Sequence, residues 1–155
     1  MLPDDPQGRR EQVRNSALAS LTRREHGTAE LRTKLNAKFN EPELADETIE
    51  WLQGLGYLDD QRFTEAFVRS SIARGRGPIR ITQELRQKGV DSNLVEQVLA
   101  EVDVDWRELA QEALERRFRQ PSAEIKGDMK EKAKRVRYLQ YRGFYPDDVF
   151  SLVNS

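Results

Sequence analysis

The sequence contains no cysteine, a single histidine, and no apolar run long enough to cross a membrane. Without cysteine, disulfide scaffolds and thiolate metal sites are excluded, and the composition suits a reducing cytoplasm. A transmembrane helix needs about 20 consecutive apolar residues, so we expect no membrane partner. The first ten residues are polar and include two prolines, which is not the pattern of a secretory signal. We therefore expect a cytoplasmic protein without a metal or other cofactor.

No segment shows sustained strand-like alternation, and apolar residues recur instead at helical spacing. Val13, Ala17 and Leu21 form one such stripe. Gly89 and Gly143 each follow a basic residue, as is typical of a helix C-terminus. The pattern predicts nine helices, near residues 12–24, 28–39, 42–54, 60–74, 78–88, 92–102, 105–119, 127–142 and 146–154.

The helical pattern repeats about every 50 residues. The runs 35–39, 85–89 and 139–143 each end a helix, and a short helix with polar or acidic residues in its first turn follows each one. Such a period is typical of stacked helical units. We predict an all-α protein, an elongated tandem array of three three-helix repeats at 12–57, 58–104 and 105–155, preceded by a disordered tail at 1–11. The alternative is one compact helical domain in which the repeat is incidental.

Charged residues make up 34% of the chain, but the formal net charge is only −1. Basic residues gather in the middle helices of the second and third repeats, and acidic residues lie at the starts of the third helices. If the middle helices line one side of the array, that side carries a positive potential that attracts phosphate or an acidic protein surface. For any single run, a solvated helix face is the ordinary interpretation.

The residues that enzymes need are missing. His26 lies at a predicted turn, where a lone histidine is more often a helix-terminal residue than a zinc ligand. Asp59 is explained as a helix N-cap and Asp60 as an acid in the first turn. Gly77 and Pro78 fit a flexible turn that opens a helix better than a phosphate loop. We expect a protein that acts by binding and not as an enzyme.

Several ordered motifs resemble the RecX family. Gly56–Phe63 resembles the Gly-Tyr-Leu-Asp-Asp-x-Arg-Phe element of RecX proteins, and Gly77–Val90 resembles their Gly-Pro-x-Arg-Ile-x-x-Glu-Leu-x-x-Lys-Gly-Ile segment. Arg24–Leu35 is similar to the opening repeat of the family, and Tyr138–Phe144 to the closing one. The resemblance covers nearly everything from about residue 14 onward.

The resemblance implies a negative regulator of the RecA recombinase that takes part in DNA repair, homologous recombination and the SOS response. Such a protein binds in the groove of the RecA–DNA filament and limits filament extension, ATPase activity and strand exchange. Single- or double-stranded DNA would be a weaker, electrostatic partner. The resemblance identifies no single binding residue. Our candidates for contact with RecA or DNA are therefore chosen by charge and position: Arg74, Arg76, Arg80, Arg86, Lys88, Lys130, Lys134, Arg135, Arg137 and Arg142.

A general DNA- or RNA-binding helical module is the second hypothesis, because it would rest on the same basic helices. Steeply salt-dependent binding to naked DNA, unchanged by RecA, would favour it. Tyr138 and Tyr141 lie on the basic eighth helix, where they would either stack on bases or pack in the core.

Overall fold

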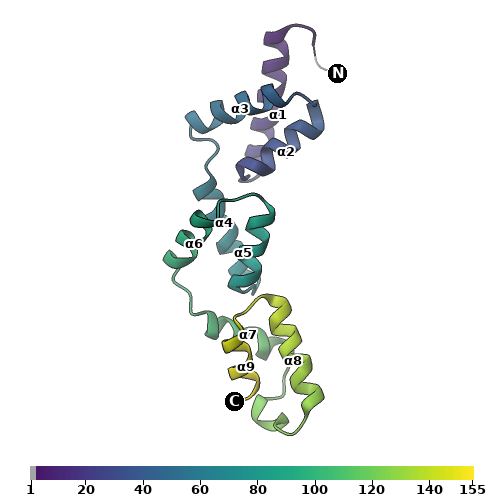
Figure 1. Cartoon of the computed structure of the whole chain (residues 1–155), viewed down its shortest axis with the longest axis vertical. Helices are drawn as coiled ribbons and strands as arrows, with labels where there is room; N and C mark the ends of the chain where they lie inside the picture. Colours follow the sequence, from purple (N-terminus) through teal and green to yellow (C-terminus); the bar gives the residue numbers. More distant parts are fainter. Residues whose placement is uncertain (1–2) are drawn as a thin grey trace. The chain divides into compact units, whose positions relative to one another are not determined.

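The computed structural model describes residues 3–155, and regular secondary structure in this range is entirely helical (Figure 1). The all-α prediction is therefore confirmed. The described residues form nine α-helices and one short 3-10 helix: α1 (Pro6–Arg23), α2 (Thr28–Phe39), α3 (Pro42–Gly54), α4 (Asp60–Ala73), α5 (Pro78–Gln87), α6 (Ser92–Glu101), α7 (Trp106–Arg117), η1 (Ser122–Ile125), α8 (Met129–Arg142) and α9 (Pro146–Val153).

The helix boundaries follow the capping residues that the sequence indicates. An Oδ atom of Asp105 accepts a hydrogen bond from the backbone N–H of Glu108 at 3.1 Å, which fixes the start of α7. Asp59 caps α4 in the same way. Gly89 and Gly143 have positive φ angles of 79° and 95°, a left-handed conformation in which glycine ends a helix without a Cβ clash.

The N-terminal segment differs from its prediction. Its polar composition suggested disorder through residue 11, but α1 begins at Pro6, and Asp5 accepts a hydrogen bond from Gly8. Arg9 and Arg10, in the same helix, form ion pairs with acidic residues 41 and 47. These long-range pairs are not visible in the local pattern that predicted a tail. The first two residues of that predicted tail lie outside the described range.

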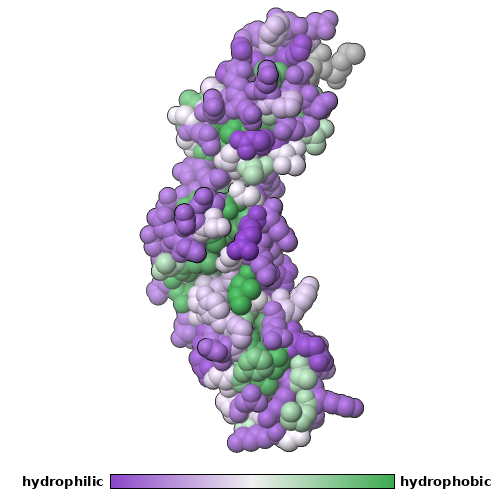
Figure 2. Space-filling model, in the orientation of Figure 1, coloured by the Kyte–Doolittle hydropathy of each residue, from purple (hydrophilic) through white to green (hydrophobic). Residues whose placement is uncertain are grey.

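The helices form two compact units. The first unit contains the residues up to Ala66 together with Leu85–Val95, and the second contains Phe67–Glu84 together with Glu96–Ser155. Over both units, the face drawn in Figure 2 is mostly hydrophilic, and apolar residues appear only in limited areas. This surface agrees with the high share of charged residues in the sequence.

Each unit has its own apolar core. In the first unit, α1, α2 and α3 contact one another pairwise. Their core consists of Val13, Ala17, Leu31, Leu35, Ala45, Ile49, Leu52 and Leu58. In the second unit, α7, α8 and α9 also contact one another pairwise. Their core consists of Ala110, Ala113, Leu114, Phe118, Leu139, Phe144, Val149, Leu152 and Val153. The first and third repeats are thus three-helix bundles with separate cores.

Within the first unit, the start of α2 meets residues of the following repeat. The backbone N–H of Thr28 donates a hydrogen bond to Asp60 Oδ1 at 2.7 Å. Gly89, just after α5, lies so close to Ala29 that a Cβ atom on the glycine would be 2.6 Å from the alanine Cβ. Asp60 therefore caps a neighbouring helix, a role that its first-turn position did not reveal.

Within the second unit, the start of α5 meets the end of α8 in a corresponding way. The backbone N–H of Gly77 donates to the carbonyl oxygen of Arg142 at 2.7 Å, and that of Ile79 donates to Gly143 at 2.9 Å. A Cβ atom on Gly77 would run into the Gly143 carbonyl group and approach the Phe144 nitrogen to 2.6 Å. We call this contact the α5–α8 joint, and it places the candidate site described next.

Candidate functional site

Four of the predicted contact residues come together at the α5–α8 joint. Arg74 follows α4, Arg76 lies in the turn before α5, Arg80 lies in α5, and Arg142 ends α8. The Arg142 side chain donates through Nε to the carbonyl oxygen of Gly75 at 3.2 Å, and also to the carbonyl oxygen of Arg74. We call Arg74, Arg76, Arg80 and Arg142 the arginine cluster. Arg142 thus ties the turn before α5 to the end of α8.

The arginine cluster carries more positive charge than its acidic neighbour balances. Glu84 pairs with Arg80 at 2.8 Å and with Arg76 at 3.5 Å. Desolvation, and then the positive charges of the other three cluster arginines, lower the pKa of Arg76, while Glu84 opposes them. The buried Nε atom of Arg76 has no hydrogen-bond partner among the described residues. The result is a site with an excess of positive potential.

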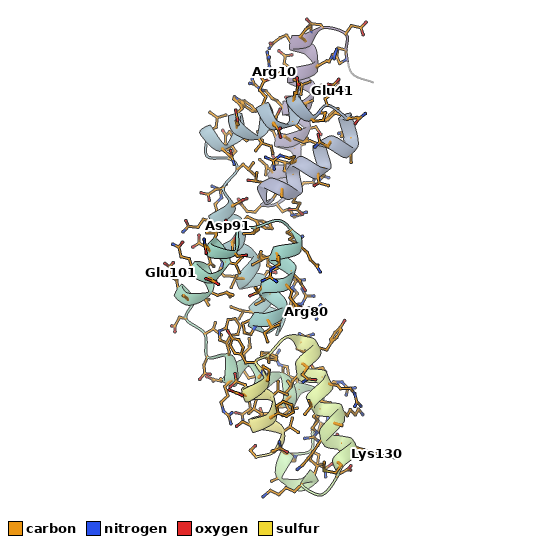
Figure 3. The ribbon with its side chains drawn as sticks, in the orientation of Figure 1. Arg10, Glu41, Arg80, Asp91, Glu101 and Lys130 are labelled. Atoms are coloured by element: carbon orange, nitrogen blue, oxygen red, sulfur yellow. The ribbon has the colours of Figure 1, made fainter. Side chains whose placement is uncertain are left out.

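A second basic feature runs along α8. Lys130, Lys134, Arg137 and Tyr141 are spaced at i, i+4, i+7 and i+11, which places them on one helical face. All four side chains are exposed. In the part of the chain that the structure describes, none of the three cations forms an ion pair within 4.0 Å. We call these four residues the α8 stripe, and Figure 3 marks its first residue, Lys130.

Arg135 does not belong to this exposed face. Its side chain is 2% exposed and pairs with Glu131 at 3.2 Å through Nε. Its guanidinium carbon also lies 5.0 Å from the centre of the Phe118 ring. The structure therefore buries Arg135 inside the third repeat, away from the exposed face of α8. Its contact with a partner stays a prediction that nothing in the structure supports.

Two of the predicted residues, Arg86 and Lys88, belong to the first unit. Arg86 is exposed, whereas Lys88 is partly buried and lies 3.7 Å from a carboxylate oxygen of Glu30. The structure thus gathers Arg74, Arg76, Arg80 and Arg142 into one cluster and does not add these two residues to it.

Three acidic residues at the start of α3 or just before it form ion pairs inside the first unit. Arg9 pairs with Glu41 at 3.4 Å, and Arg10 pairs with Glu47 at 2.6 Å. Figure 3 marks Arg10 and Glu41 in this region. On α2, Arg32 pairs with acidic residue 46 at 2.9 Å. In the first repeat, these acidic residues therefore pair with arginines of the same repeat. On α8, by contrast, the cations of the α8 stripe stay exposed.

The two tyrosines of α8 have different surroundings. Tyr138 is partly buried and packs edge-to-face on Phe118, with 5.6 Å between ring centres. Tyr141 is 74% exposed, and the guanidinium carbon of Arg80 lies 5.1 Å from its ring centre. The sequence left both roles open for both residues. The helical register with Lys130 and Arg137 was the signal that could have separated them.

The described residues contain no group of three or more histidine, cysteine, aspartate or glutamate side chains suited to a metal ion. His26 is buried at the turn between α1 and α2, and its Nδ1 lies 3.0 Å from the carbonyl oxygen of Arg24. This turn position agrees with the structural interpretation of the residue. None of the helices among the described residues combines the length and apolarity needed to span a bilayer.

Three tandem three-helix domains define the class of protein to which the chain belongs. Comparison with known families then gives matches to the RecX first three-helix domain at residues 14–52, the second at 59–99 and the third at 103–153. The chain belongs to the RecX family. The resemblance of its motifs and the tandem arrangement of three-helix repeats are both confirmed.

Curated relatives agree along most of the chain. "Regulatory protein RecX" of Halorhodospira halophila is 43% identical over 139 residues, which cover 90% of this chain and 84% of the relative. The protein of the same name from Vibrio parahaemolyticus is 41% identical and covers 88% of this chain and 86% of its own length. The crystal structure of RecX from Lactobacillus salivarius matches with a TM-score of 0.75 at 23% identity, over 93% of this chain and 94% of that one. This last likeness supports the fold.

Proposed function

We propose that this protein is a negative regulator of RecA that acts in the cytoplasm by binding in the groove of the RecA–DNA filament. In that position it limits filament extension, ATP hydrolysis and strand exchange during DNA repair and the SOS response. Membership of the RecX family supports a regulatory role. The observation that supports the contact surface is the exposure of Lys130, Lys134 and Arg137 on the α8 stripe, none of which forms an ion pair within 4.0 Å among the described residues.

The physical basis of the proposal is the sum of many weak contacts. Each exposed cation that meets a phosphate releases a counterion, and each one that meets a carboxylate adds a screened attraction. Along a helix, the residues from Lys130 to Arg137 extend over about 10 Å, and the arginine cluster adds further charge in the same unit. Several such contacts, made at once by one rigid surface, bind more tightly than any single contact does.

The proposed contact set differs slightly from the one that charge alone predicted. It contains Lys130, Lys134 and Arg137 of the α8 stripe, the four residues of the arginine cluster, and Arg86 and Lys88 of the first unit. Arg135 is left out because it is buried. Reversal of the charge on Arg80 or Lys88 is a poor test, because each forms an ion pair within its own unit and its loss would also disturb the fold.

A sharper test uses exposed cations that have no such role. Lys130→Glu combined with Arg137→Glu changes the charge of the α8 stripe. Arg23→Glu combined with Lys34→Glu makes the same change of charge at two exposed residues of the first unit, so it is a matched control. The measurement is RecA-dependent ATP hydrolysis on single-stranded DNA with substoichiometric amounts of each protein. Circular dichroism checks that helicity is unchanged.

We expect the unaltered protein to inhibit ATP hydrolysis. The stripe variant should need on the order of tenfold more protein for the same inhibition, since two phosphate or carboxylate contacts become repulsive. The control variant should behave like the unaltered protein. Absence of inhibition by the unaltered protein would refute the proposed function, and equal loss in both variants would refute the α8 stripe as its contact surface.

A further inference from the structure

The Tyr141 side chain lies in solvent at the end of the α8 stripe. At 74% it is the most exposed of the large hydrophobic side chains described, ahead of Met129 at 73%. It contributes little to the core of the third repeat, which Tyr138 joins instead. An aromatic ring held in solvent at the end of a basic stripe is therefore available for a partner.

One face of the Tyr141 ring is covered by Arg80, and this arrangement is anchored on both sides. Arg80 donates to Glu84 at 2.8 Å through Nε, so its guanidinium group is held in place. The backbone near Arg80 is fixed by the α5–α8 joint, where a Cβ atom on Gly143 would lie 2.6 Å from the Arg80 nitrogen. Arginine stacked on one face orients the ring through a cation–π contact and leaves the other face open.

From this arrangement we infer that Tyr141 stacks on an unpaired base of a single-stranded nucleic acid, whose phosphates follow Lys130, Lys134 and Arg137 along α8. From Lys130 to Tyr141 the stripe is about 16 Å long, which is enough for a few nucleotides. The inference deepens the proposed function and rests on it, because it names the part of the nucleoprotein filament that this surface touches.

The exposed ring favours a single strand over a duplex. In a duplex, neighbouring base pairs cover the base faces, and a protein without an inserting wedge reaches only the phosphates and the groove edges. In a single strand, the base faces are open, and stacking on an aromatic ring beside a positively charged groove is the usual mode of binding. Phosphate contacts alone would bind both forms, so selectivity for the single strand comes from Tyr141.

The test compares two fluorescein-labelled probes without RecA: an oligo-dT of about 20 nucleotides and a duplex of about 20 base pairs. Fluorescence anisotropy gives the dissociation constant for each probe. The variants are Tyr141→Ala, which removes the ring, and Tyr141→Phe, which keeps the ring but removes the hydroxyl group. Tyr57→Ala is the matched control, because Tyr57 is 55% exposed and lies in the first unit.

We expect Tyr141→Ala to bind oligo-dT about 5- to 150-fold more weakly and to bind the duplex unchanged, as loss of one base stack predicts. Tyr141→Phe and Tyr57→Ala should bind both probes like the unaltered protein. Equal weakening on both probes would show that Tyr141 only shapes the basic surface, and no weakening would show that it meets a protein partner or none. Either result overturns the inference.

The same variants, tested for inhibition of RecA-dependent ATP hydrolysis, separate the two proposals. If Tyr141→Ala binds oligo-dT normally while the unaltered protein inhibits RecA, the base-stacking inference fails and the proposed function stands. If the unaltered protein does not inhibit RecA but Tyr141→Ala shows the expected loss of binding to oligo-dT, the proposed function fails while the single-strand site on α8 is supported.

Discussion

Gly77→Ala is a one-methyl perturbation of the α5–α8 joint. The φ angle of Gly77 is not positive, so an alanine meets no backbone strain there. The added Cβ atom instead collides with the carbonyl group of Gly143 and comes within 2.6 Å of the Phe144 nitrogen. All of these are backbone atoms, which cannot rotate away as the end of a flexible side chain can. The two chain segments must therefore move apart.

The expected cost follows from the contacts that this movement breaks. Two hydrogen bonds cross the joint, from Gly77 to Arg142 at 2.7 Å and from Ile79 to Gly143 at 2.9 Å. At about 0.5–1.5 kcal/mol each, their loss lowers the free energy of unfolding by about 1–3 kcal/mol. An alanine at the residue before a helix is less favourable than glycine by up to about 1 kcal/mol. We expect a total loss of about 1–4 kcal/mol.

Urea denaturation followed by circular dichroism measures this loss. The control is Gly54→Ala near the end of α3, where no atom lies within 4 Å of the added Cβ and the residue is helical. That variant should be as stable as the parent or more stable by up to about 1 kcal/mol. A Gly77→Ala protein that unfolds within about 0.5 kcal/mol of the parent would contradict the claim that the joint is closely packed.

Two further predictions concern the first unit. Gly89→Ala should lower the free energy of unfolding more than Gly56→Ala does, because both glycines have φ near 80° but only Gly89 has a neighbour, Ala29, at 2.6 Å from the added Cβ; equal losses in urea denaturation would mean that only the backbone angle matters. Burial lowers the pKa of His26 against the opposing effect of the Arg24 carbonyl group, so the folded protein favours the neutral imidazole. Stability should therefore be complete above about pH 6.5 and fall as the pH drops below it, because the unfolded chain takes up the proton first. The urea midpoint of His26→Leu should show less dependence on pH between about 7.5 and 5.5 than that of the parent, and an unchanged dependence would show that other groups cause it.

Local chemistry made most of the fold predictable. Asp59, Asp105, Gly89 and Gly143 each act on the few residues around them, so their capping roles could be read from spacing. The start of α1 was missed although Asp5, which caps Gly8, and Pro6 give a local signal for it. The ion pair of Arg10 with its α3 partner joins residues far apart in the sequence and could not be read from the local pattern. A helix that is held by tertiary contacts gives a weak local signal.

The candidate site was only partly predictable for the same reason. Charge alone selected Arg135 together with Arg137, although one is buried and the other exposed. Helical periodicity separates them, since residues two positions apart point in different directions. The grouping of Arg76 with Arg142 could not be read from the sequence, because it depends on backbone hydrogen bonds across the α5–α8 joint.

The α5–α8 joint has a consequence for how chain length can vary in this protein. Free backbone N–H groups at the start of α5 and free carbonyl groups at the end of α8 satisfy each other, so one contact completes two helix ends. One residue inserted into α8 just before Gly143 would turn that end by about 100° and carry the carbonyl groups away from their donors. An insertion between Phe118 and Asp128 would lie outside the joint and leave those bonds in place. Tolerance to insertion thus differs sharply between two neighbouring parts of the same repeat.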